Sequence, residues 1–362
     1  MAIELSLCMI VKNEGKNLCN CLDSVKGVFD EINIVDTGSI DNTVELAKRY
    51  TDRVFYYEWE DDFAGARNFS FSKATKEYIM WLDADDIVTQ ENVKKLLKLK
   101  KGLSRDIQYV MMYYYYNIDE NGNSLLTQKR ERILKRSAGF SWVSPVHEYV
   151  DVSGKGLSAD IFISHNHREL SKRSMERNFR ILEKLIKLGN RDKRIIKYYA
   201  QSFSDEKDLD KNLKYINLFI EMNKEDSIVD PSIYLKAYEI YATKKDYENA
   251  FKVLKESEGL LGNTSEYQCI LGCYYWDVKK DKEKSLECFY RALGCTGETL
   301  IVRDEGYYYF KPNFFLGRVY LSNKGYQPAY EFFKKAYSFR QYDELNEIVK
   351  KIERYIGLSK KL

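Results

Sequence analysis

Short hydrophobic runs alternate with segments of helical periodicity over the first eighty residues of the chain. Four apolar runs, each bounded by polar loops, have the length and pattern of buried strands and cover residues 3–11, 31–35, 53–57 and 78–82. The segments between them place apolar side chains at helical spacing, at residues 17–25, about 41–50 and 63–74. This alternation predicts an α/β domain with a mainly parallel sheet covered by helices on both faces.

From about residue 170 the pattern changes to one helix-sized segment after another. A degenerate repeat aligns three of these segments on a small residue, at Ala250, Ser285 and Ala329, with spacings of 35 and 44 residues. Gly272 and Gly317 lie in L-G-x-x-Y elements, which are typical of tetratricopeptide helix pairs with their period of about 34 residues. We therefore expect an α-helical array of about four hairpins with close crossings at the small residues, although generic helical hairpins would fit the same pattern.

The composition changes where the pattern changes. Residues 1–168 carry 22 Lys and Arg against 25 Asp and Glu, whereas residues 169–362 carry 36 against 30. A chain of 362 residues is long enough for two domains, so we expect an α/β domain over 1–168 and a helical domain over 169–362. The formal net charge of +3 shows no large basic excess, which argues against a nucleic-acid partner.

Cysteine usage and hydropathy indicate the compartment. Seven scattered cysteines, an odd number, favour a reduced cytoplasmic chain over a secreted disulfide framework. The N-terminus lacks the basic lead of a signal peptide, and no window of about twenty apolar residues could span a membrane. Cys269 and Cys273 stand four apart on a helical pattern with no histidine near them, so we expect buried small hydrophobic residues and not a metal pair.

Polar clusters follow three of the expected strands, beginning at Lys12, Asp36 and Asp83. In a parallel sheet the carboxyl ends of the strands share one edge, where ligands bind. Asp83-Ala84-Asp85 follows a buried strand and places two carboxylates on one side of the chain. Such a pair suits a hard divalent cation, Mg²⁺ or Mn²⁺, which neutralises a diphosphate. A solvated acidic turn is the alternative for an isolated pair, and the agreement of three polar loops favours the cation site.

Four ordered segments resemble the family 2 nucleotide-sugar glycosyltransferases, which have the GT-A fold. Within residues 5–168 these segments are SLCMIVKNE, IVDTGSIDNT, EDDFAGARN and WLDADD. The W-x-x-DF-x-x-ARN segment, PVHEYV at residues 145–150 and the tetratricopeptide-like tail are similar to the peptide S-glycosyltransferases that modify cysteines of sublancin-type glycocin bacteriocins. The resemblance implies a Rossmann-like GT-A domain, a UDP-sugar donor, bound Mg²⁺ or Mn²⁺, and inverting transfer.

The resemblance assigns most of these polar residues to the nucleotide sugar. Asp36 matches the acidic residue that faces the base, Asp83 would contact the ribose, and Asp85 would be the principal metal ligand, with Asp86 behind them. Backbone groups would line the base and ribose at Val11, Asn13 and Glu14. The other expected contacts of the donor are with Asp62, Arg67, Ala84, Arg132, Trp142 and Arg173.

Arg67 and a later run of basic residues each have two possible interpretations. Arg67 lies in DF-x-x-ARN and would either bind the ligand or form a structural pair with Asp61 or Asp62, which its spacing permits. The run from Lys172 to Lys197 contains ten Lys and Arg against three acidic residues. It reads either as a solvated helix face or as a positive wall for the diphosphate, whose best-placed members are Arg173 and Arg177.

All three histidines lie between residues 147 and 167, just before the change in composition. Inverting transfer needs a base for the acceptor's proton and charge stabilisation on the leaving group. Glu148 is the candidate base and His147 the candidate third metal ligand or diphosphate contact, and the two roles could be exchanged. His165 is the better placed of the other two for a role in the site, with His167 at the domain junction.

The predicted function is metal-dependent transfer of a hexose from a UDP-sugar, with UDP-glucose favoured, to a Cys thiol or a Ser/Thr hydroxyl of a peptide such as a bacteriocin precursor. Helical repeats offer extended concave surfaces that suit a peptide. Two alternatives stay open: assembly of a cell-surface glycan or lipopolysaccharide core, and a nucleotide-binding scaffold without catalysis. The resemblance also suggests a homodimer formed through the helical domain.

Overall fold

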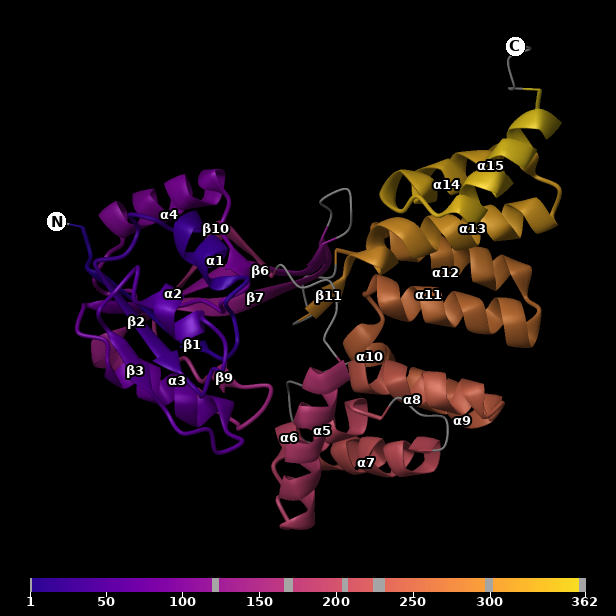
Figure 1. Ribbon diagram of the computed structural model, residues 1–362. Helices are drawn as coiled ribbons and strands as arrows, with labels where there is room; N and C mark the ends of the chain where they lie inside the picture. The colour runs from indigo at the N-terminus through magenta and orange to yellow at the C-terminus, as the bar shows by residue number, and fades with distance from the viewer. Residues whose placement is uncertain are drawn as a thin grey trace. The chain divides into compact units, whose positions relative to one another are not determined.

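The chain forms two compact units in the computed structural model, residues 1–199 and 200–362. The structure describes residues 2–118, 124–165, 172–203, 208–223, 232–296 and 302–357. Figure 1 shows a sheet with surrounding helices in the first unit and stacked helices in the second. The first unit includes α5 (Lys172–Lys187) and most of α6 (Lys193–Gln201), two helices that lie beyond the boundary expected at residue 168.

One mixed sheet forms the centre of the first unit. Its strands are β1 (Leu5–Val11), β2 (Glu31–Asp36), β3 (Val54–Tyr56), β4 (Tyr78–Trp81), β5 (Asp86–Ile87), β6 (Tyr109–Ile118), β7 (Ser124–Lys135) and β10 (Gly156–His165). They follow the order β3-β2-β1-β4-β7-β6-β10-β5. A separate antiparallel pair consists of β8 (Trp142–Val143) and β9 (Tyr149–Val150).

The four strands expected from the sequence are confirmed, and their ends differ from the expected ones by at most two residues. They are parallel to one another, as predicted. Beyond β4 the sheet becomes mixed, because β6 and β7 form a long antiparallel hairpin and β7 also runs antiparallel to β4. The parallel part therefore brings the ends of β1, β2 and β4 to one edge, where the polar loops begin.

Alternating side chains of β1 explain why helices cover both faces of the sheet. The helices concerned are α1 (Leu18–Ser24), α2 (Thr43–Ala47), α3 (Phe63–Ser72) and α4 (Gln90–Gly102). Leu7 and Met9 point into a core shared with α1, α2 and α4. Cys8 points into a second core on the opposite face, shared with α3. Two buried faces require the nearly continuous apolar run that predicted β1.

The second unit is helical, as predicted, apart from the short strand β11 (Val302–Asp304) and two π-helical turns at residues 275–279 and 306–310. Its helices are α7 (Leu209–Met222), α8 (Ser232–Thr243), α9 (Tyr247–Glu256), α10 (Glu258–Leu261), α11 (Ser265–Tyr274), α12 (Lys282–Gly294), α13 (Lys311–Ser322), α14 (Tyr326–Phe339) and α15 (Asp343–Tyr355). The pairs α8–α9, α11–α12 and α13–α14 pack as hairpins. Five of these six helices, all except α8, contain a small residue singled out in the sequence, at Ala250, Gly272, Ser285, Gly317 and Ala329.

Small residues permit the close crossings within these hairpins. A Cβ atom on Gly272 would lie 2.5 Å from the ring of Phe289, and one on Gly317 would lie 2.7 Å from the ring of Phe333. The small residues aligned by the repeat are fully buried: Ala250, Ser285 and Ala329. The expectation of close helix crossings is therefore confirmed. Packing against the facing rings is the reason that glycine occupies both positions.

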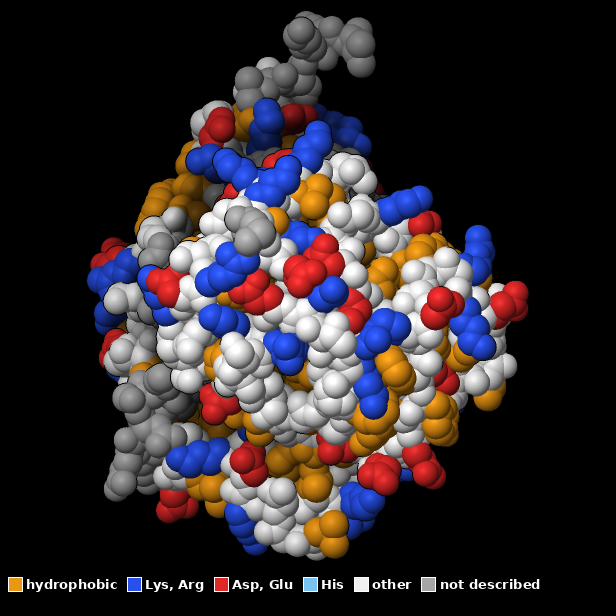
Figure 2. Space-filling model, turned by 90° about the vertical axis from the view of Figure 1, so that its left-hand side faces the viewer, with side chains coloured by type: hydrophobic (Ala, Val, Ile, Leu, Met, Phe, Trp, Pro, Cys, Tyr) orange, Lys and Arg blue, Asp and Glu red, His pale blue; other side chains and the backbone are white. Residues whose placement is uncertain are grey.

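The cysteines and the surface agree with the composition. All seven cysteines are free, and burial raises the pKa of the Cys273 thiol to about 12. Among the helices that the structure describes, none is long and apolar enough to cross a membrane. On the face shown in Figure 2, acidic and basic side chains are interspersed, in keeping with the small net charge.

Gly272→Ala should destabilise the helical unit by about 1–3 kcal/mol, because the added methyl group must displace the Phe289 ring. The better helix propensity of Ala, about 1 kcal/mol, offsets part of this cost. Gly259→Ala is the matched control, since a Cβ atom there meets nothing within 4 Å. Urea unfolding followed by circular dichroism measures both variants, and equal midpoints would contradict the close crossing.

The Glu31 carboxylate collects hydrogen bonds that tie β2 to its surroundings. It accepts from Ser6 Oγ at 2.8 Å, from Asn33 Nδ2 at 2.8 Å and from both Oγ1 and N of Thr75, at 2.5 and 2.9 Å. Burial by itself would raise the pKa of Glu31, but these hydrogen bonds lower it to about 2. The lowered pKa means that this carboxylate stabilises the fold fully above its unfolded pKa of 4.5.

Glu31→Gln should therefore lower the free energy of unfolding by about 2–3 kcal/mol at pH 7. The loss should shrink as the pH falls from 4.5 towards 2, because the wild-type carboxylate loses its advantage across that window. Urea midpoints at pH 7 and pH 3 measure the difference, with the exposed Glu91→Gln as control. A loss of the same size at both pH values would refute the assignment.

Candidate functional site

The loops that follow β1 and β2 are joined into one wall of the candidate site. The backbone N–H of Asn13 donates to Ser39 Oγ at 2.9 Å, and the Asn13 side chain accepts from the N–H of Ile40 at 2.8 Å. The N–H of Glu14 donates to Thr43 Oγ1 at 2.7 Å. Asn13 has a φ of 57°, a left-handed conformation that asparagine tolerates well.

Asp36 closes the turn at the end of β2. Its carboxylate accepts from the N–H groups of Gly38 and Ser39, at 3.0 and 3.1 Å. Val11 is its register partner in β1, and the carbonyl of Val11 accepts from the N–H of Thr37 at 2.9 Å. The structure thus brings the expected nucleotide residues of these two loops together, with part of their hydrogen-bonding capacity used to hold the loops.

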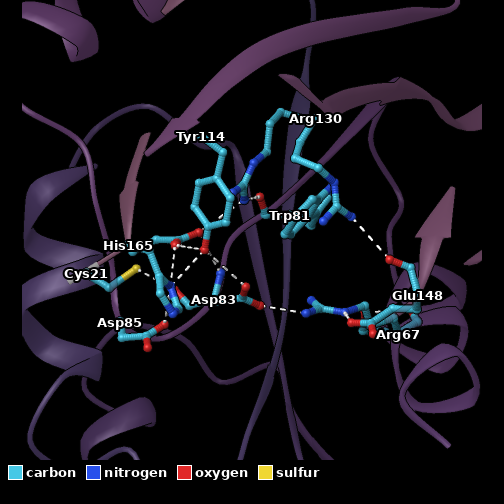
Figure 3. A network of polar contacts seen from close by, with 12 residues as sticks. Cys21, Arg67, Trp81, Asp83, Asp85, Tyr114, Arg130, Glu148 and His165 are labelled. Atoms are coloured by element: carbon cyan, nitrogen blue, oxygen red, sulfur yellow. Dashed lines mark hydrogen bonds and ion pairs between the residues drawn. The ribbon is translucent and has the colours of Figure 1, made fainter. Parts of the chain in front are cut away.

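The acidic residues after β4 have different environments (Figure 3). Asp86 is fully buried and accepts from Arg132 Nη1 at 3.0 Å, from the Tyr114 hydroxyl at 2.6 Å and from the N–H of Asp83 at 3.0 Å. The Asp83 side chain is 26% exposed and that of Asp85 is 11% exposed. Asp86 therefore anchors this loop from inside the domain, while Asp83 and Asp85 lie closer to the solvent.

Arg132 and Ala84 lie inside the domain and not at its surface. Arg132 is fully buried, and its guanidinium lies 3.7 Å from the ring centre of Trp81 and 4.1 Å from that of Tyr114. Ala84 packs in the hydrophobic core shared with α1. The expected contact of Arg132 with a diphosphate is therefore not available from its position, because its charge neutralises Asp86 and its faces are covered by aromatic rings.

Burial and neighbouring charges set the ionisation of the site. Burial alone would raise the pKa of Asp83, but the charges of Arg67 and Arg132 lower it to about 2. Burial raises the pKa of Asp85 to about 7, against the opposing effect of His165. Burial alone would lower the pKa of His165, but its hydrogen bond with Asp86 and the charge of Asp85 raise it to about 8. The three groups thus form one coupled cluster.

Three neighbouring side chains have the donor atoms of a divalent-cation site. Asp83, Asp86 and His165 each present a ligand atom within 4.8 Å of the others. The Nδ1 atom of His165 also lies 3.3 Å from Asp85 Oδ1. Carboxylate oxygens with an imidazole nitrogen suit Mg²⁺ or Mn²⁺. His147, the expected third ligand, belongs to no such group among the described residues, so the structure brings a different histidine to the acidic loop.

Arg67 joins the acidic loop to the loop at residues 144–148. Its Nη2 atom lies 2.7 Å from Asp83 Oδ1, and its Nε atom donates to Glu148 Oε1 at 2.8 Å. The guanidinium lies 4.7 Å from the ring centre of Trp142 and 5.1 Å from that of Trp81. Burial by itself would lower the pKa of Arg67, but the charges of the two carboxylates have the larger effect and raise it. Arg67 therefore stays charged between its partners.

The expected structural pair of Arg67 with Asp61 or Asp62 is not formed. Asp62 instead caps α3, where its side chain accepts from the N–H of Gly65 at 3.0 Å. Asp61 pairs with Arg180 of α5 at 2.9 Å. Close spacing in the sequence suggested these partners, but the partners of Arg67 come from other segments of the chain.

His147 and Glu148 point to different neighbours. Besides its bond to Arg67, Glu148 has its carbonyl oxygen 3.3 Å from Arg130 Nη2. The His147 ring stacks on Tyr198 of α6, with ring centres 3.9 Å apart and planes 8° apart. Burial lowers the pKa of His147 to about 4, which keeps the ring neutral at pH 7. The two residues are adjacent in the chain but separate in environment.

Of the two arginines named from the basic run, Arg173 is exposed at the start of α5, while Arg177 is partly buried with its guanidinium 4.7 Å from the ring centre of Phe63. Glu148 is among the charges that act on Arg177. His167 lies outside the described residues.

Sequence reasoning missed several residues that hold the site together. Tyr114 donates to Asp86 and also bonds to His165 Nδ1 at 2.8 Å. Arg130 lies 5.0 Å from the Trp81 ring centre. The sequence carried one signal for this role. Arg130 and Arg132 are two residues apart in one strand, so their side chains lie on the same face of the sheet. The tyrosine run at residues 113–116 lies in β6, and its member Tyr114 is buried.

Comparison with known proteins gives a consistent set of similarities. Residues 6–164 match the family model for glycosyl transferase family 2. Over 242 residues the chain is 28% identical to the SPbeta prophage-derived glycosyltransferase SunS of Bacillus subtilis, covering 63% of this chain and 56% of that protein. It is 31% identical over 150 residues to a TPR repeat-containing protein of Synechococcus elongatus, covering 41% of this chain and 36% of that protein. The chain thus spans about half the length of these relatives, or less.

Among solved structures, one match is S. aureus TarS 1-349. It superimposes with a TM-score of 0.40 at 15% sequence identity, and the match covers 70% of this chain and 91% of that one.

Arg67→Met should lower the free energy of unfolding by about 3–5 kcal/mol, because it leaves two partly buried carboxylates unpaired. Arg105→Met is the control, since it breaks a pair with Glu77 in which the arginine side chain is 52% exposed and should cost less than about 1 kcal/mol. Urea unfolding at pH 7 measures both variants. Similar losses would contradict the bridging role of Arg67.

Proposed function

We propose that the chain, whose residues 6–164 match the family model for glycosyl transferase family 2, transfers a hexose from a UDP-sugar to a Cys thiol or a Ser/Thr hydroxyl of a peptide. UDP-glucose is the donor to test first. The observation that carries the proposal is the Arg67 bridge, which holds Asp83 and Glu148 around one guanidinium. Sugar transfer requires a site for the leaving diphosphate beside a base for the acceptor. The bridge holds Asp83, which belongs to the proposed diphosphate and cation site, next to Glu148, the proposed base.

The nucleotide is assigned to the wall formed by the loops after β1 and β2. Asp36 would face the base, with backbone groups of the 11–14 segment along the base and ribose, and Asp83 would contact the ribose. Arg173 is the proposed contact of the diphosphate from α5. Two further residues support the wall and the bridge from behind. Asp62 caps α3, and Trp142 packs on Arg67.

The cation is assigned to Asp83, Asp85 and His165. Asp86 already accepts from Arg132 and Tyr114, so it holds the ligands in place from behind. Carboxylates with an imidazole fit Mg²⁺ or Mn²⁺, and such an ion, when bound, neutralises charge on the departing diphosphate. In this assignment His165 takes the role of third metal ligand that was expected for His147.

In the transfer step the acceptor sulfur or oxygen forms a bond to the anomeric carbon. The bond from that carbon to the diphosphate oxygen breaks, and its electron pair leaves with UDP. Glu148 takes the acceptor's proton: Oε1 is occupied by Arg67, while Oε2 makes no hydrogen bond to any residue that the structure describes. A thiol needs less help than a hydroxyl, since a few per cent is already thiolate at pH 7.

A peptide acceptor is supported by the motif resemblance to peptide S-glycosyltransferases and by the helical unit. Helical repeats provide long surfaces suited to extended chains. Cell-surface glycan assembly and a non-catalytic scaffold are the competing functions that the experiments must exclude. We further propose a cytoplasmic location, in line with seven free thiols, and a homodimer formed through the helical unit.

Asp85→Asn should abolish UDP release from UDP-glucose and should remove the Mn²⁺ dependence of UDP binding while the protein stays folded. The physical reason is the loss of an anionic cation ligand. Coupled UDP release and titration calorimetry with and without EDTA measure the two effects. Asp160→Asn is the matched control, because that side chain is 72% exposed and pairs with Lys95. An unchanged rate in Asp85→Asn would refute the cation assignment.

The acceptor class is tested by offering the wild-type protein matched peptides with Cys, Ser or Ala at one position, and glycan acceptors in parallel. Mass spectrometry should show one added hexose on the Cys or Ser peptide and none on the Ala peptide. Transfer to glycans alone would favour the cell-surface function. The absence of both UDP release and transfer would favour the scaffold.

A further inference from the structure

The loop at residues 144–148 carries backbone strain beside the Arg67 bridge. It connects β8 to β9, and two of its non-glycine residues are left-handed: Ser144 with φ 75° and His147 with φ 54°. Side chains with a Cβ atom rarely adopt this conformation unless their surroundings hold them there. Glu148 follows directly, so the conformation of His147 sets the direction from which Glu148 enters the site.

Helix α6 holds His147 by two different contacts. Arg194 Nε donates to the His147 carbonyl oxygen at 2.8 Å, and the Tyr198 ring stacks on the His147 ring. These two residues are four apart, so they share one face of the helix. Asp192 fixes the start of this helix, since its side chain accepts from the N–H of Arg194 at 2.8 Å. Arg194 also lies 4.3 Å from the ring centre of Tyr149, just past the loop.

Helix α5 holds the same loop through the segment at the start of α3, residues 61–63. Arg180 pairs with Asp61 at 2.9 Å, and Arg177 covers the ring of Phe63. The N–H of Phe63 donates to the carbonyl oxygen of Pro145 at 2.9 Å. The loop is thus supported at Pro145 by a segment bound to α5, and at His147 by α6.

We propose that α5 and α6, which lie beyond the residues matched by the family model, form a brace that positions Glu148, with Arg194 and Tyr198 as its positioning residues. This inference rests on the proposed function for the role of Glu148 as base. The brace holds His147 on one side of the peptide bond, and Arg67 and Arg130 hold Glu148 on the other. Without the brace, His147 relaxes to an ordinary φ and the carboxylate leaves its place beside Asp83.

Tyr198→Leu and Arg194→Gln test the brace in the full-length chain. Each should lower kcat for sugar transfer about 10- to 100-fold, the effect of a small displacement of a reacting group. The Kd for UDP in the presence of Mn²⁺ should stay within about twofold of the wild type, since the nucleotide loops are untouched. Hydrogen exchange of the backbone at residues 144–149 should become faster in both variants.

Two controls match these variants. Tyr198→Phe keeps the stacked ring and removes the contact of the hydroxyl with Arg194 at 3.4 Å, so it should retain wild-type kcat and exchange if the stacking holds the loop. Arg191→Gln removes the same charge from an exposed position next to α6 and should change neither.

The outcomes separate this inference from the proposed function. Unchanged exchange at residues 144–149 in Tyr198→Leu would overturn the brace, whatever the activity. Faster exchange with unchanged kcat would overturn the positioning role. If the wild type transfers no sugar and releases no UDP, the proposed function fails and the positioning role of the brace fails with it, while hydrogen exchange still decides whether α6 holds the loop.

Discussion

The guanidinium of Arg67 is the contact on which the candidate site depends. It joins α3 to the loop after β4 and to the loop between β8 and β9, through ion pairs of 2.7 and 2.8 Å. Two tryptophan rings enclose it, so its charge is poorly solvated and needs both carboxylates. The same burial strengthens each pair, because a lower dielectric screens them less. Removing Arg67 leaves the carboxylates of Asp83 and Glu148 without the cation that lies between them.

A second charged layer lies beneath this contact and supports it. Asp86, Arg132 and Tyr114 are fully or almost fully buried, and they fix the acidic loop from within the core. The layer lets Asp83 and Asp85 remain close together at the surface of the site despite their mutual repulsion. The division between a buried anchor and accessible ligands explains how three carboxylates can follow one short strand.

Much of the fold could be predicted from the sequence because its patterns are local. The apolar run that forms β1 needs two covered faces, and the alternation of Leu7 and Cys8 between two cores shows why. The repeat around Gly272 and Gly317 predicted the close helix crossings, since only a residue without a side chain fits against the facing rings. The acidic loop after β4 could also be placed, because parallel strands end at a common edge.

The partners of charged and aromatic side chains could not be predicted in this way. Local patterns were enough to predict that strands, polar loops and the D-x-D element meet at one edge of a sheet. Three features depend on the folded chain: Arg132 is buried under that edge, His165 and not His147 reaches the acidic loop, and Arg67 bridges to Glu148. The physical reason is range: strand and helix periodicity arises from neighbours a few residues apart, whereas these pairs join residues at least 46 positions apart, which meet when the sheet forms.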